Sequence, residues 1–209
     1  MKKLMTAVVV AAFAGLVLMP APAAADLRFG IKGGVNAAKI FGEDADLEGD
    51  WQNKLGFCAG VFLQLNIGSV LTIQPEVLYT MKGAKLEETF EDVTYTGKLL
   101  FDYLEIPLLV KLRIPTGRVS PFVFAGPSIG FKLSSKIKFT GGGESSEEDL
   151  DELKSVDYGA IFGAGLNLGR SFHLDVRYSM GLQKLIDDPE IGTIDIKNGV
   201  ISATVGFAF

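Results

Sequence analysis

The sequence predicts an all-β protein, an eight-stranded antiparallel up-and-down transmembrane β-barrel. Three observations predict it. Eight segments alternate apolar and polar residues at the two-residue period of a strand. Their connections alternate between short and long, as they do when turns lie at one end of a barrel and loops at the other. Aromatic residues occur near both ends of the apolar rows, where a membrane has its two interfaces.

The first 25 residues have the pattern of a secretory signal peptide. Two lysines precede a largely apolar run from Leu4 to Met19, and three alanines provide a cleavage site before Asp26. A membrane-spanning helix is the rival interpretation, but the run is short and ends at Pro20. We therefore expect residues 1–25 to be a cleaved signal and residues 26–209 to form one barrel domain.

Charge and cysteine content narrow the class of protein. Removal of the signal takes away two lysines and no acids, which changes the net charge from −5 to −7. Such an acidic chain is unsuited to nucleic acid, whose phosphates attract basic surfaces. Cys58 is the single cysteine, so an intramolecular disulfide is excluded, and we interpret this residue as part of the barrel wall.

Clusters of Gly, Asn, Asp, Ser or Pro bound each of the eight expected strands. In chain order the segments are LRFGIKGGVNA from Leu27, LGFCAGVFLQLNI from Leu55, SVLTIQPEVLYTMK from Ser69, YLEIPLLVKLRIP from Tyr103, PFVFAGPSIGFKL from Pro121, VDYGAIFGAGLNL from Val156, FHLDVRYSMGL from Phe172 and NGVISATVGFAF from Asn198. Tight turns are expected near residues 66–69, 115–119 and 169–171. Long loops are expected at about residues 40–53, 83–98, 135–156 and 184–197.

The first four segments divide most clearly into two rows. In the first, Leu27, Phe29, Ile31 and Val35 lie opposite Arg28, Lys32 and Asn36. The apolar rows of the next two run from Leu55 to Ile67 and from Leu71 to Met81. The fourth carries an unbroken apolar row from Leu104 to Ile114, opposite a row with Glu105, Lys111 and Arg113.

Two features decide that the apolar rows face lipid and the mixed rows face the lumen. Aromatic residues form two girdles: Phe29, Phe172, Phe207 and Phe209 near the turns, and Phe57, Tyr79, Phe131, Tyr158 and Tyr178 near the loops. The mixed rows combine charges with many glycines, which suits a narrow, crowded interior. In a soluble barrel the facing would be inverted.

Charges inside a narrow barrel must be paired to be tolerated. The predicted lumen offers Glu76, Glu105, Asp157 and Asp175 against Arg28, Lys32, Lys54, Lys82, Lys111, Arg113, Lys132 and Arg177. We expect a charge network of Arg28, Lys32, Glu76, Glu105, Lys111, Arg113, Asp175 and Arg177, in which Glu105 lies among Lys111, Arg113 and neighbouring bases. Pro75, Pro107 and Pro127 fall inside strands, and each predicts a bulge or a lost ladder bond.

The chain resembles the outer-membrane β-barrel domain family, also labelled porin family or PorT-like. The resemblance covers Leu27 to Phe209 and rests on YLEIPLLVKLRI, QPEVLYTMKG, SPFVFAGPSIGF, YGAIFGAGLNL, LDVRYSMGL and the terminal Phe209. It implies a multi-pass barrel in the cell outer membrane, surrounded by outer-membrane lipid, with short periplasmic turns and four long extracellular loops. It also implies insertion by the barrel-assembly machinery, for which Phe207 and Phe209 would be the signal.

Acidic residues concentrate in the four expected loops, which hold 19 of the 25 acids. These loops also hold seven lysines, so their net charge is −12. The acids either keep the loops solvated or attract divalent cations or a cationic partner. Within the first loop, Asp44, Asp46 and Glu48 match the first positions of a calcium loop, but Leu55 stands where a bidentate Glu is required.

The remaining motifs indicate structure rather than chemistry. His173 is the single histidine and lies two residues beyond a short turn, where a hydrogen bond to Asp175 or to nearby backbone is expected. We expect no catalytic residue, metal or cofactor, and a monomer. The leading functional hypothesis is a non-enzymatic surface barrel with acidic interaction loops. Narrow porin-like passage, a PorT-like accessory role in secretion and lipid modification remain alternatives.

Overall fold

The computed structural model describes residues 25–41, 54–90, 93–141, 144–149, 156–182, 186–188, 192–194 and 197–209. The strands are β1 (Ala25–Phe41), β2 (Lys54–Ile67), β3 (Leu71–Phe90), β4 (Val93–Arg113), β5 (Val119–Gly141), β6 (Glu144–Asp149), β7 (Val156–Leu168), β8 (Phe172–Gly181), β9 (Ile186–Asp188), β10 (Gly192–Ile194) and β11 (Lys197–Ala208). Among these residues there is no helix with the length and apolar character that crossing a membrane requires.

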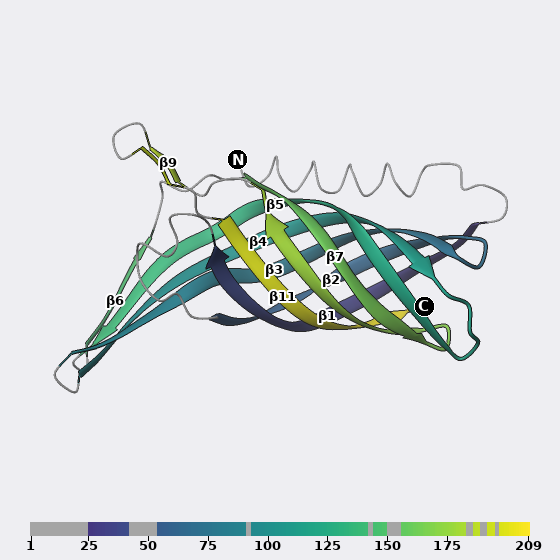
Figure 1. Ribbon diagram of the computed structural model, residues 1–209, viewed down its shortest axis with the longest axis horizontal. Helices are drawn as coiled ribbons and strands as arrows, with labels where there is room; N and C mark the ends of the chain where they lie inside the picture. The colour runs from purple at the N-terminus through teal and green to yellow at the C-terminus, as the bar shows by residue number, and fades with distance from the viewer. Residues whose placement is uncertain are drawn as a thin grey trace.

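Eight of the described strands close into an antiparallel ring (Figure 1). The order is β1, β2, β3, β4, β5, β7, β8 and β11, and β11 pairs back onto β1. Each strand therefore pairs with the next one along the ring, which confirms the predicted eight-stranded up-and-down barrel. Closure also leaves no unpaired edge in the wall.

The three connections at one end of the ring are tight turns. They occupy residues 68–70, 114–118 and 169–171. Gly68, Gly117 and Gly169 adopt φ values of 67°, 104° and 68° there, a region that costs glycine little because it has no Cβ atom. These turns agree with the sequence prediction to within one or two residues.

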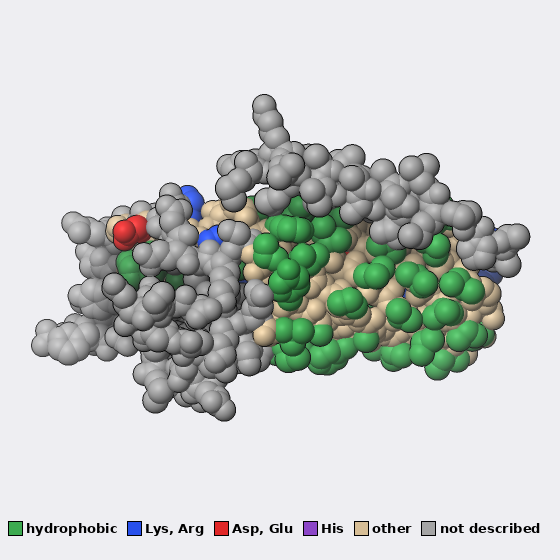
Figure 2. All heavy atoms as spheres, turned by 90° about the horizontal axis from the view of Figure 1, so that it is seen from above, with side chains coloured by type: hydrophobic (Ala, Val, Ile, Leu, Met, Phe, Trp, Pro, Cys, Tyr) green, Lys and Arg blue, Asp and Glu red, His purple; other side chains and the backbone are tan. Residues whose placement is uncertain are grey.

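Side chains of the wall alternate between the outside and the lumen as predicted. In β4, Leu108, Val110 and Leu112 are 44%, 48% and 50% exposed, whereas Glu105 and Lys111 on the opposite face are each 4% exposed. Figure 2 shows the hydrophobic side chains spread over the outer face of the barrel. The outer surface of the wall is therefore apolar, and the charges lie inside.

Aromatic side chains gather at both ends of the wall. At the turn end, Phe172 and Phe207 pack edge to face with ring centroids 5.0 Å apart, and Phe209 contacts Phe207 at 5.2 Å. At the loop end, Phe57 packs against Tyr79 at 5.7 Å. These contacts join neighbouring strands and confirm the two predicted girdles.

Inside the wall, large rings lie over glycines of the neighbouring strand. Phe122 and Phe124 of β5 pair in register with Gly165 and Gly163 of β7. A Cβ atom built on these glycines would lie 2.5 Å from the Phe122 ring and 2.6 Å from the Phe124 ring. Backbone carbonyl oxygens of Leu174 and Val176 in β8 would lie closer still, so the rings and the adjacent strand together require glycine at both positions.

The sheet continues beyond the wall at the loop end, where the sequence was expected to form loops. Residues 83–90 of β3 pair with residues 93–100 of β4, and residues 136–141 of β5 pair with β6. The loops were predicted from the Gly, Asn, Asp, Ser or Pro clusters that bound the expected strands, but the Thr, Tyr, Phe and Ile residues of these segments favour strands. The projecting strands are visible in Figure 1 on the side of β6.

The prolines interrupt ladder pairing without shifting it. Pairing between β3 and β4 lapses beyond Pro75 and resumes at Leu78 in the same register, and the β4 and β5 ladder lapses next to Pro107 in the same way. Lost ladder bonds, rather than bulges, therefore accommodate these residues. The register shift along β4 and β5 lies elsewhere, between Asp102 and Tyr103.

The outward apolar row of β4 predicts how the stability of the barrel changes when a charged residue is introduced into the wall. Leu108→Arg would place a cation against the hydrocarbon near mid-strand, and we expect it to lower the free energy of unfolding by about 2–4 kcal/mol. Ile114→Arg, next to a turn, should cost only about 0–1 kcal/mol because its cation reaches the interface. Urea unfolding in lipid vesicles measures both, and equal costs would contradict the assignment of the wall.

Candidate functional site in the barrel lumen

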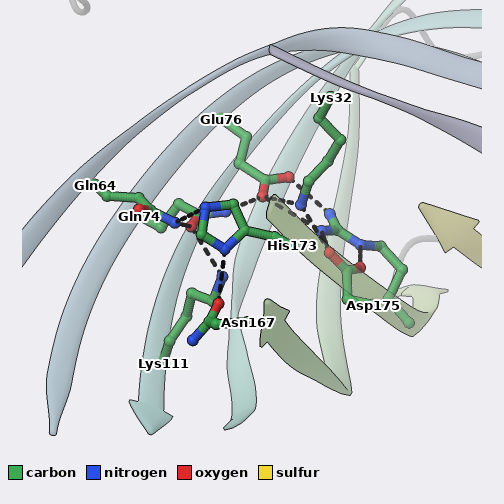
Figure 3. Close-up of polar contacts among 9 residues, drawn as sticks. Lys32, Gln64, Gln74, Glu76, Lys111, Asn167, His173 and Asp175 are labelled. Atoms are coloured by element: carbon green, nitrogen blue, oxygen red, sulfur yellow. Dashed lines mark hydrogen bonds and ion pairs between the residues drawn. The ribbon is translucent and has the colours of Figure 1, made fainter. Parts of the chain in front are cut away.

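Four charged residues form the centre of the lumen. Lys32 comes from β1, Glu76 from β3, and Asp175 and Arg177 from β8, each at an inward position of the two-residue alternation. Their side chains are at most 3% exposed. Figure 3 shows Lys32, Glu76 and Asp175 pointing toward one another inside the ring.

Each acid of this cluster contacts both cations. Lys32 Nζ lies 2.8 Å from Glu76 Oε1 and 3.0 Å from Asp175 Oδ2. Arg177 Nη1 lies 2.7 Å from Glu76 Oε2, and its Nε lies 2.9 Å from Asp175 Oδ1. Two positive and two negative charges therefore balance, and the ion pairs tie β1 and β8 to β3 across the lumen.

A second cluster lies closer to the loops. Lys82 of β3 contacts Glu105 of β4 at 3.0 Å and Asp157 of β7 at 3.6 Å, and its Nζ lies 5.0 Å from the centre of the Tyr103 ring. Lys54 donates to the backbone carbonyl of Lys82 at 2.9 Å. Glu105 thus faces the lumen as predicted, but the cation it contacts is Lys82 rather than Lys111 or Arg113.

Two glutamines extend the central cluster toward the turns. Gln74 Nε2 donates to Glu76, and Gln74 Oε1 accepts from Lys111 Nζ at 3.0 Å and from Gln64 Nε2 at 2.9 Å (Figure 3). The Lys111 ammonium also lies 4.0 Å from the centre of the Phe122 ring, a cation–π contact. Sequence reasoning placed Gln74 in the inward row but gave neither glutamine a role, because only charged residues were considered as partners.

His173 has different partners from those expected. Its Nδ1 lies 2.7 Å from Asn167 Oδ1, its Nε2 lies 3.5 Å from Gln64 Nε2, and its ring meets Phe62 edge-on at 5.8 Å. The expected hydrogen bond to Asp175 is replaced because Lys32 and Arg177 already occupy both oxygens of that carboxylate.

The other sequence-predicted residues lie at the periphery of the lumen or outside the described chain. Arg28 contacts Asp26 at 2.8 Å and the carbonyl of Arg170 at 2.9 Å, and Arg113 Nε donates to the carbonyl of Ser69 at 3.0 Å. Phe207 and Phe209 stand in the outward girdle at the end of the chain. The calcium candidates Asp44, Asp46 and Glu48 lie outside the described residues.

The inward side chains cross-link the interior of the barrel. Salt bridges and hydrogen bonds hold the inward side chains, and within the described ranges no group of three or more His, Cys, Asp or Glu residues could hold a metal ion. The lumen thus joins strands from opposite sides of the ring through charged contacts.

The closed eight-stranded ring with an apolar exterior and a charged lumen is that of an outer-membrane β-barrel. The chain belongs to the outer membrane protein beta-barrel domain family, whose model matches residues 20–187. A comparison with curated proteins finds no match.

Several solved structures are similar to this chain at low sequence identity. Ail, the attachment invasion locus protein of Yersinia pestis, is 18% identical with a TM-score of 0.47, over 88% of this chain and 99% of that one. Neisserial surface protein A is 15% identical with a TM-score of 0.44, over 87% and 97%. The outer membrane enzyme PagL is 14% identical with a TM-score of 0.43, over 84% and 97%.

Membership of the family places the protein in the outer membrane. The tight turns of such barrels face the periplasm, and the long connections face the exterior of the cell. The turn end of the lumen, with His173 and Arg113, is therefore the periplasmic end. The paired strands β5 and β6 project on the extracellular side.

The two acids and two cations of the central cluster balance, and this predicts which buried acid contributes most to the stability of the barrel. Glu76→Gln would leave Lys32 and Arg177 with Asp175 alone, and we expect it to lower the free energy of unfolding by about 3–5 kcal/mol. Glu105→Gln is the matched control, since Lys82 keeps its contact with Asp157, and it should cost about 1–3 kcal/mol. Urea unfolding in lipid vesicles compares them, and a neutral Glu76→Gln would refute the cluster's role.

Proposed function

We propose that the protein is a non-enzymatic outer-membrane barrel whose acidic extracellular connections form an interaction surface. The observation that carries this proposal is the cross-linked lumen. Glu76 and Asp175 are no more than 1% exposed, and Lys32 and Arg177 are held against both. An eight-stranded interior is just wide enough for side chains to fill, so the barrel serves as an anchor rather than as a conduit.

The loop end supplies the chemistry for an interaction. The four segments that the sequence predicts to be loops contain 19 of the 25 acidic residues of the chain and carry a net charge of −12. Part of this charge stands on a paired strand, since Glu147 and Asp149 of β6 lie opposite Lys138 and Lys136 of β5. These acidic residues therefore belong to a paired strand and not to free chain.

The chemistry of a partner follows from this charge. A surface of one sign concentrates ions of the opposite sign and accelerates the approach of oppositely charged proteins. The acidic surface therefore suits divalent cations that bridge it to anionic lipid headgroups, or a cationic protein. Both interactions weaken as salt screens the charges.

An enzymatic role is less well supported by the described residues. Acyl transfer or hydrolysis at neutral pH calls for a nucleophile with an adjacent general base. The single histidine contacts the amide groups of Asn167 and Gln64, and neither amide can act as a nucleophile activated by it. Non-enzymatic function therefore remains part of the proposal.

Planar bilayer recordings test the anchor role. We expect the purified protein to insert without producing stepwise conductance, because ion pairs cross the lumen at its centre. Glu76→Gln, which removes a charge from that cluster, provides a variant in which leakage should increase. Regular conductance steps in the unaltered protein would contradict the anchor role and favour passage of small solutes.

Neutralising the loop acids tests the interaction surface. In a variant with Glu147→Gln, Glu148→Gln and Asp149→Asn, we expect at least a threefold loss of binding to polylysine, or of Mg²⁺-dependent binding to vesicles of anionic lipid. The two probes separate a cationic partner from divalent bridging.

A control with the opposite change in charge accompanies this test. Lys98→Gln, Lys136→Gln and Lys138→Gln remove three charges from neighbouring strands, and this variant should bind at least as well as the unaltered protein. If both variants bind both probes as the unaltered protein does, the acidic connections are not an interaction surface.

A further inference from the structure

The periplasmic mouth of the lumen contains a cavity of about 180 Å³. It is bounded by residues of the turns that follow β2 and β7, including Gly68 and Gly169, and by inward residues of β1, β4 and β8. One water molecule takes up about 30 Å³ of liquid volume, so the cavity has room for a small ion and its remaining waters.

Positive charge exceeds negative charge around this cavity. Its lining contains four cations, Arg28, Lys111, Arg113 and Arg170, and one carboxylate, that of Asp26. Asp26 forms an ion pair with Arg28 at 2.8 Å, which leaves the other three cations without a carboxylate in the lining. The centre of the lumen differs, because two acids there balance two cations.

Lys111 is the most deeply placed of these cations and is 4% exposed. Its contacts are the Gln74 side-chain oxygen at 3.0 Å and the rings of Phe122 and Phe124, and it forms no ion pair among the described residues. Gln74 Oε1 also accepts from Gln64 and is therefore shared. A buried ammonium with one neutral acceptor has hydrogen-bonding capacity left for an anion.

Arg113 lies two residues along the same inward row of β4. Its Nε donates to the carbonyl of Ser69, and within the described chain its two terminal nitrogens have no hydrogen-bond partner. The planar guanidinium can donate from these atoms to two oxygens of one ligand. Asn167 and His173 bound the cavity from β7 and β8 and add neutral polar groups on another side.

We propose that this cavity binds a phosphate group at the periplasmic mouth of the barrel. The polar groups come from β1, β4, β7 and β8, so they surround a ligand instead of meeting it from one side. A tetrahedral phosphate presents four oxygens and accepts hydrogen bonds from several directions, whereas a carboxylate presents two oxygens in one plane. Lysine and arginine together are the usual donors to phosphate.

The single histidine of the chain provides a reporter for this site, because His173 lies in the cavity lining and no other residue contributes imidazole signals. The full barrel, folded in a phosphate-free uncharged detergent, would be titrated with inorganic phosphate at constant pH and constant ionic strength. We expect the NMR signals of the His173 ring to shift and to saturate. A shift that grows linearly without saturation excludes a soluble phosphate ligand, and the same result with the lipid probe described below overturns the proposal.

Three variants connect the shift with the cations. Lys111→Gln and Arg113→Gln should each raise the phosphate concentration at half saturation by at least tenfold. Lys138→Gln makes the same change on β5 at the opposite end of the barrel and should leave that concentration unchanged within twofold. If Lys111→Gln fails to fold, Arg113→Gln at the rim still tests the site. Equal phosphate concentrations at half saturation for Arg113→Gln and Lys138→Gln overturn the proposal.

A parallel titration separates the two sources of phosphate chemistry. Dihexanoyl phosphatidylglycerol supplies an anionic phosphate as a lipid headgroup, in place of the free ion. Saturation by inorganic phosphate supports a soluble phosphate ligand, and saturation by the short-chain lipid alone supports a headgroup of the periplasmic leaflet. Saturation by neither overturns the site.

Discussion

The neutralised charge cluster of Lys32, Glu76, Asp175 and Arg177 is the interaction on which the rest of the barrel depends. Lipid surrounds the wall, so the outward row is apolar and polar side chains turn inward. An eight-stranded ring encloses little more than the volume of those side chains. Charges forced into that space lose water, and the four charges of this cluster persist because each is paired, which fixes the strands that carry them relative to one another.

Volume is the second constraint on the same interior, and aromatic rings beside glycines satisfy it. Phe62 pairs in register with Gly30, and a Cβ atom on that glycine would overlap the ring. The same relation holds for Phe122 and Phe124 with their glycines on β7. The rings fill space between the charged groups and also present their faces to Lys111 and Arg177, so packing and charge stabilisation use the same side chains.

Most of the wall could be predicted from sequence because its signal is local. The two-residue alternation around Leu104 to Ile114 predicts the strand and the residues that share each of its faces without reference to any other segment. The partners of inward residues could not be predicted, since they depend on the stagger of strands distant in sequence. Glu105 meets Lys82 and His173 meets Asn167 for that reason. The strand character of residues 83–98 was missed because the two-sided alternation is not continued there, whereas the structure pairs these residues with β4 and β5.

Charge is distributed unevenly along the barrel axis, and this distribution bears on how the protein stays oriented. Basic residues are in excess at the periplasmic mouth, charges balance at the centre, and most acids of the chain occur in the four segments that the sequence predicts to be extracellular loops. Under the proposed arrangement, the net charge of −12 of these segments opposes their return through hydrocarbon, because each unpaired charge would have to lose its water. The wall of the barrel also helps to maintain the orientation. A return of these segments would require strands to separate, and the central ion pairs resist that separation. Orientation is therefore maintained by the same rule that organises the lumen: charge is stable in this protein where it is solvated or paired, and the membrane offers neither.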